Sequence, residues 1–81
     1  MRKIDAMKQV IADNGGIANW QIIYSEIEKY KPDAKRSADW QAGLRGVLYR
    51  DMEMVGIKKV DTGLFALNEY DTRRLISDAG G

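Results

Sequence analysis

The chain has 81 residues, of which 44% are hydrophobic and 31% are charged, a mixture typical of one small globular domain. Its 13 basic and 12 acidic residues leave a net charge of +1, so bulk charge points to no particular partner. The lack of cysteine and histidine excludes disulfides, thiolate metal sites and the usual general base. No apolar run is long enough to span a membrane or to serve as a signal peptide. We therefore expect a soluble cytoplasmic domain, nucleoid-associated in a prokaryote, with no metal, cofactor or catalytic activity.

The N-terminal segment is typical of an amphipathic helix, because apolar residues recur at helical spacing at Ile4, Met7, Val10 and Ile11. Gly15 and Gly16 are expected to end this helix, since glycine accepts the left-handed conformation that follows many helices. The short extended piece near Ile17 can be stable only if it pairs with another strand.

Two further helices are predicted. The first covers residues 20–30, with Asn19 as its N-cap, and it ends before Pro32 because the residue preceding a proline leaves the helical region. The second covers residues 38–54, with Ser37 as its N-cap, and it follows a loop without apolar pattern.

The third predicted helix has two distinct sides. Its apolar side carries Trp40, Leu44, Val47 and Leu48. Its opposite side carries Gln41, Ala42, Arg45, Gly46, Tyr49 and Met52. Gly43 and Gly46 each weaken a helix by about 0.5–1 kcal/mol relative to alanine. We therefore expect these glycines to permit the close approach of another helix or of a ligand.

After Gly56 the apolar period changes to two, which predicts a hairpin of strands 57–60 and 64–67 joined by residues 61–63. The strand near Ile17 can pair with this hairpin and complete a three-stranded sheet. The polar tail, residues 69–81, is expected to be partly disordered, with a possible helical turn over residues 73–76. The predicted core comprises Trp20, Ile23, Ile27, Trp40, Leu44, Leu48, Phe65 and Leu67.

The order helix, short strand, helix, helix, hairpin predicts an α+β fold, a winged helix-turn-helix over residues 1–68, although other arrangements share this order. Three segments also resemble the HARE-HTH family and the winged-helix domains attached to restriction endonucleases: Ile23–Tyr30, Leu48–Asp51 and Gly63–Leu67. This resemblance covers about residues 3–68. It implies DNA binding, either by an appended reader of a restriction or DNA-modification enzyme or by a small regulator of transcription. The hairpin tip carries Asp61 and Thr62, where a basic residue is frequent in such domains.

A winged helix-turn-helix would place the third helix in the major groove of DNA. Gln41 and Arg45 lie one turn apart, so they are the candidate readers of adenine and guanine, and Tyr49 is the next residue along the same side. Candidate contacts to the DNA backbone are Lys35, Arg36 and Ser37 at the start of the helix, and Lys58, Lys59 and Thr62 of the hairpin. Adjacent lysines in a strand point to opposite faces, so Lys58 and Lys59 cannot both face one partner from the same sheet face.

The distribution of charge supports a basic face in the middle of the chain. Seven basic and four acidic residues give residues 31–60 a net charge of +3, while residues 1–30 are neutral and residues 61–81 carry −2. The leading hypothesis is a non-catalytic module that binds double-stranded DNA, alone or beside a nuclease or modification domain. The alternative is a winged-helix module that binds another protein, because a net charge of +1 is low for a DNA-binding domain.

Overall fold

A computed structural model of the chain describes residues 1–73. The helical turn and the disordered end that the sequence predicts after residue 73 lie outside these residues. The described elements are α1 (Lys3–Asp13), β1 (Ile17–Asn19), α2 (Trp20–Glu26), the short 3-10 helix η1 (Ile27–Lys29), α3 (Trp40–Asp51), β2 (Ile57–Asp61) and β3 (Leu64–Leu67). Among them, no helix has the length and apolar character needed to cross a bilayer.

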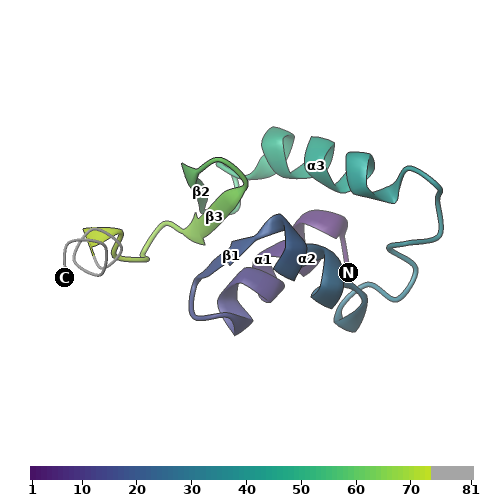
Figure 1. The fold of residues 1–81 in the computed structure, drawn as a ribbon, viewed down its shortest axis with the longest axis horizontal. Coiled ribbons are helices and arrows are strands. Elements are labelled where there is room, and N and C mark those ends of the chain that lie inside the picture. Colours follow the sequence, from purple (N-terminus) through teal and green to yellow (C-terminus); the bar gives the residue numbers. More distant parts are fainter. Residues whose placement is uncertain (74–81) are drawn as a thin grey trace.

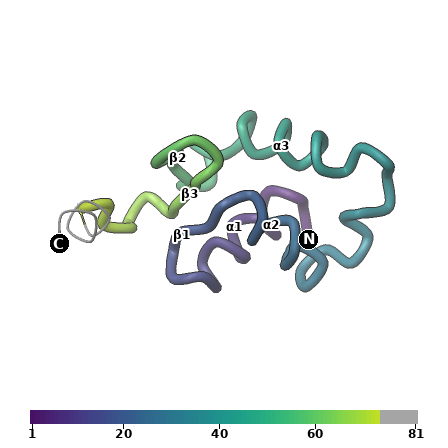
Figure 2. Tube along the Cα trace, in the orientation of Figure 1, coloured from purple at the N-terminus to yellow at the C-terminus, as the bar shows by residue number. Residues whose placement is uncertain are grey.

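The helices form two layers, with the small sheet at one end. α3 lies across α1 and α2, and the loop of residues 30–39 passes around the end opposite the sheet (Figures 1 and 2). The sheet is antiparallel with the order β1-β3-β2, so β3 is central and the hairpin strand β2 is an outer strand. The α+β class and the pairing of the short strand near Ile17 with the hairpin are both confirmed.

The hairpin differs in detail from its prediction. β2 continues to Asp61, and the register shifts between Lys59 and Asp61, so β2 has one more residue than the alternation predicts. The turn is therefore shorter, and Gly63 takes a positive φ of 68° in it.

Of the two N-caps that the sequence predicts, one caps its helix and the other does not. The Asn19 side chain accepts a hydrogen bond from the Ile22 N–H at 2.9 Å, which confirms Asn19 as the N-cap of α2. The predicted N-cap Ser37 is wrong: α3 begins only at Trp40, and Asp39 precedes it. The Ser37 hydroxyl donates instead to the Asp39 carboxylate. α3 also ends at Asp51, before the predicted residue 54.

The core is centred on α1, which packs against α2, α3, β1 and β3. Five expected core residues are fully buried, namely Ile23, Ile27, Leu44, Leu48 and Phe65, whereas Trp20, Trp40 and Leu67 are only partly buried. The predicted core omits the residues of α1. Their side chains fill its centre: Ile4, Ala6, Met7, Val10 and Ile11.

Tyr30 connects the end of η1 to the end of α1, because its hydroxyl donates a hydrogen bond to the Asp13 carboxylate. This hydrogen bond is the main reason why the pKa of Asp13 lies below its usual value, and a hydrogen bond from Gln9 lowers it further. The same contact raises the pKa of Tyr30. Both shifts mean that the contact is complete when Asp13 is ionised and Tyr30 is protonated.

We expect Ile11→Ala to lower the free energy of unfolding by about 2–5 kcal/mol, because it opens a cavity in a fully packed position. Lys8→Ala, on the exposed side of the same helix, should change it by less than about 0.5 kcal/mol. Urea unfolding measures both variants. An equal effect of the two substitutions would contradict the central position of α1.

We expect Tyr30→Phe to lower stability near neutral pH, with a difference from the wild type that depends on pH. Because the pKa of Asp13 is lowered in the folded state, its contribution is present above the unfolded pKa, about 4, and is lost as the pH falls through the folded value. Urea midpoints at pH 7 and pH 2.5 measure this difference. A gap between wild type and variant that stays constant down to pH 2.5 would contradict the contact.

Candidate functional site

The outward side of α3 carries small residues at its centre. Ala42 and Gly46 occupy successive turns of this side, the larger Tyr49 follows one turn further, and all three are exposed. A side chain built at Gly46 would meet nothing within 4 Å, and one built at Gly43 would meet only the Lys3 amine at 3.8 Å. In the described part of the chain, neither glycine therefore serves the close approach of another helix.

Five aromatic side chains fill the space where α2, α3 and the hairpin meet. We call them the aromatic cluster: Trp20, Tyr24, Trp40, Tyr49 and Phe65. Trp20 is stacked on Tyr24 with ring centroids 5.4 Å apart, and it meets Phe65 edge-on at 5.1 Å. Tyr24 also meets Trp40 edge-on at 5.2 Å. The cluster therefore joins elements that are distant in the sequence, as edge-to-face and offset ring pairs do in protein interiors.

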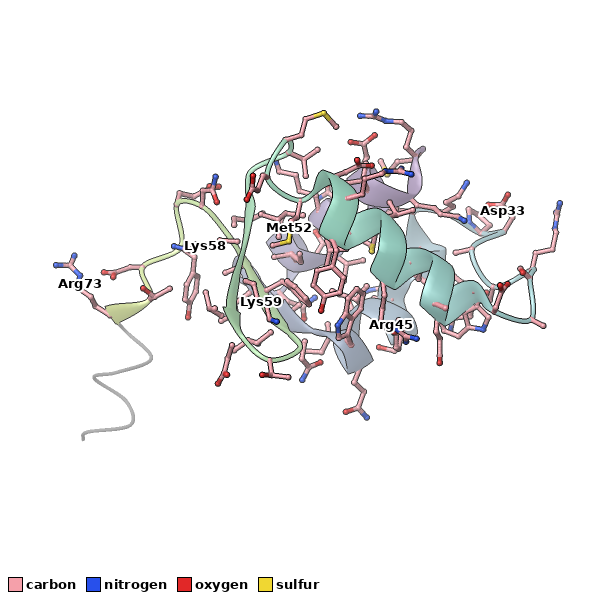
Figure 3. The ribbon with its side chains drawn as sticks, turned by 90° about the horizontal axis from the view of Figure 1, so that it is seen from above. Asp33, Arg45, Met52, Lys58, Lys59 and Arg73 are labelled. Atoms are coloured by element: carbon pink, nitrogen blue, oxygen red, sulfur yellow. The ribbon has the colours of Figure 1, made fainter. Side chains whose placement is uncertain are left out.

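Three cations lie against this cluster. The Lys35 amine is 4.9 Å from the centre of the Trp40 ring, and the Lys59 amine is 5.8 Å from that of Tyr49. Arg45 donates from Nη1 to the Tyr24 hydroxyl at 2.9 Å. Figure 3 shows Arg45 and Lys59 on the same flank of α3.

The three cations differ in how far their charge is neutralised. Lys35 forms an ion pair with Glu28 at 3.2 Å. Among the described residues, no carboxylate forms an ion pair with Arg45 or with Lys59. These two side chains thus leave positive charge available on the flank of α3, beside the exposed Gln41.

The structure directs Lys58 away from this flank. Its amine donates to the backbone carbonyls of Asn68 and Tyr70, at 3.2 and 2.8 Å, and so holds the segment after β3 against the sheet. Tyr70 in turn lies 3.4 Å from the position of a Cβ on Gly16. Of the two adjacent lysines, only Lys59 therefore faces the side of α3.

The segment before α3 is less suited to an anion than the sequence predicts. The Ser37 hydroxyl donates a hydrogen bond to the Asp39 carboxylate. This hydrogen bond is the main reason why the pKa of Asp39 is lowered. Asp39 is thus a carboxylate at neutral pH, directly before the first turn of α3, where its negative charge opposes the binding of a phosphate group. Arg36 is exposed in the loop before α3.

The hairpin tip is fixed relative to the helices. The Gly63 carbonyl accepts a hydrogen bond from the Trp20 N–H at 3.2 Å, and a Cβ on Gly63 would lie 3.4 Å from the Trp20 ring. Thr62 is exposed at the tip, and its N–H donates to the Asp61 carboxylate at 2.8 Å. Of the two lysines of the hairpin that the sequence predicts to contact DNA, only Lys59 thus lies beside α3.

Tyr24 has no part in the site that the sequence predicts. Its spacing carries a signal, because residues four apart on a helix are neighbours and Trp20 precedes Tyr24 by four. The partner Arg45 is 21 residues away in the sequence, so no local pattern could indicate the hydrogen bond between them.

Gly46→Ala should stabilise the free protein by about 0.5–1 kcal/mol, because alanine is the better helix former and its methyl group meets no neighbour. Thermal or urea unfolding measures the change. A loss of stability would show that the glycine serves the packing of the chain itself.

Comparison with known proteins finds no family model, no curated protein and no solved structure that matches this chain.

Proposed function

We propose that this chain is a winged helix-turn-helix module that binds double-stranded DNA without catalysing a reaction. α3 occupies the major groove, and the hairpin β2–β3, the wing of this fold, lies beside the sugar–phosphate backbone. Such a module acts as a small regulator or as the reader of a restriction or DNA-modification enzyme.

One observation carries this proposal: Arg45 and Lys59 lie on the same flank of α3, and no described carboxylate pairs with either. DNA is the partner that unpaired cations beside an exposed helix suit best, because binding to phosphate groups releases counterions. The helix itself fits the major groove, and the small residues Ala42 and Gly46 let it approach closely.

The polar residues of α3 have the chemistry for reading bases. Gln41 and Arg45 are exposed and one turn apart, near the N-terminal part of α3, where helix-turn-helix proteins contact base edges. Gln pairs with adenine and Arg with guanine through two hydrogen bonds each. Tyr49, which is 49% exposed, lies one turn further along, within reach of sugar or phosphate.

A second function has one observation in its favour. Tyr49 and Met54 are large hydrophobic residues that are 49% and 70% exposed, at and beyond the C-terminal half of α3. Exposed apolar side chains on a small domain suit a protein partner. A winged-helix module that binds a protein through α3 is therefore the alternative.

An NMR titration with a short duplex tests the proposal and separates it from the alternative. Backbone signals of α3 and of the hairpin turn should move on addition of DNA, and those of the exposed side of α1 should stay still. The apparent affinity should fall steeply with salt. Shifts confined to α1 and to residues 69–73, or no binding of any duplex at low salt, would overturn the proposal.

Two neighbouring lysines provide a matched pair of variants. Lys59→Gln should weaken binding to all duplexes alike and lower the slope of log affinity against log salt by about 0.9, as expected for one lost phosphate contact. Lys58→Gln makes the same change of charge, but the Lys58 amine is bound to backbone carbonyls, so its slope should change much less. Fluorescence anisotropy at several salt concentrations measures both slopes. Equal slopes for the two variants would contradict a specific contact of Lys59.

A further inference from the structure

The contact between Arg45 and Tyr24 is held in place from several sides. Nη1 of Arg45 donates to the Tyr24 hydroxyl at 2.9 Å, which connects α3 to α2. The Tyr24 ring is stacked on Trp20, with planes 24° apart, and meets the edge of Trp40 at 81°. These two rings leave the Tyr24 ring little freedom to turn, so the hydroxyl is a fixed acceptor.

A fixed acceptor restricts an otherwise flexible side chain. An arginine has five N–H donors in a planar fork, and Tyr24 uses only one of them. The remaining donors can still form two parallel hydrogen bonds with the acceptor pair of a guanine. Because the guanidinium is oriented before binding, less of its rotational freedom is lost when DNA binds.

The other tyrosine hydroxyl with a described partner has no such arrangement. Tyr30 donates to Asp13, between η1 and α1, and this contact involves no residue of α3. Of these two tyrosines, only Tyr24 therefore binds a side chain of α3 through its hydroxyl.

We propose that Tyr24 is a positioning residue that orients the Arg45 guanidinium for a guanine in the major groove, without itself touching the base. This inference rests on the proposed DNA binding. Its consequence is that the base preference at one position of the site depends on a hydroxyl group of α2.

Selection of bound duplexes from a randomised library tests the proposal, with the wild type and four variants. The wild type should enrich guanine at one position. Arg45→Ala and Arg45→Lys should both reduce this enrichment, because lysine keeps the charge but not the fork. Tyr24→Phe should reduce it at the same position by about two- to tenfold, the effect expected for one lost hydrogen bond. Tyr30→Phe, the matched control, should leave it unchanged.

Two further measurements separate positioning from a structural role. Tyr24→Phe alters no charge, so its slope of log affinity against log salt should equal that of the wild type. In the free protein, the Nε–H signal of Arg45 should show restricted motion on the nanosecond timescale, and greater mobility in Tyr24→Phe. The variant keeps the ring contacts with both tryptophans, so it should remain folded.

Each other outcome overturns the inference. Three results for Tyr24→Phe would overturn the inference but not the proposed DNA binding. They are an equal loss of affinity for all sequences, an unchanged guanine preference and an unchanged mobility of Arg45. A wild type that binds duplex DNA without base preference would do the same. A wild type that binds no duplex at low salt would overturn both the inference and the proposed function.

Discussion

Trp20 is the point at which α2, α3 and the hairpin meet. Its ring contacts Tyr24 within α2, Tyr49 of α3 and Phe65 of β3, and its backbone N–H donates a hydrogen bond to the carbonyl of Gly63 in the turn. The geometry of the outward surface therefore depends on one side chain at the first position of α2. Asn19 in turn fixes that position, because its side chain caps the helix directly before Trp20.

The residues that stabilise the fold are largely different from the charged residues on the outward surface. Residues of α1 fill the centre of the buried core, whereas the rings of the aromatic cluster lie between α2, α3 and the hairpin. Because the rings occupy that space, the polar groups around them are held at defined places without being buried. Arg45 is placed by a hydroxyl and Lys59 by a ring, and both keep their charge facing outward.

Local patterns in the sequence explain why much of the fold could be predicted. The apolar spacing of α1, the Asn19 cap and the change of period after Gly56 each depend on neighbouring residues, and all correspond to elements of the structure. The start of α3 could not be predicted in the same way: Ser37 and Asp39 are both good caps by residue type, but their side chains bond each other and Asp39 forms no capping hydrogen bond. The alternation of side chains along a strand shows that Lys58 and Lys59 point to opposite faces. Which of the two amines is hydrogen-bonded depends on the backbone carbonyls after β3, and these bind Lys58. Whether α3 contacts DNA stays a prediction.

The composition of the aromatic cluster has an optical consequence. Trp20 and Trp40 are the two tryptophans of the chain, and both contact the Tyr24 ring. Both indoles are partly buried, and one of them has the Lys35 amine over its ring. Their ultraviolet emission therefore arises at the junction of α2 and α3, so the tryptophan fluorescence of the unlabelled protein reports on this junction.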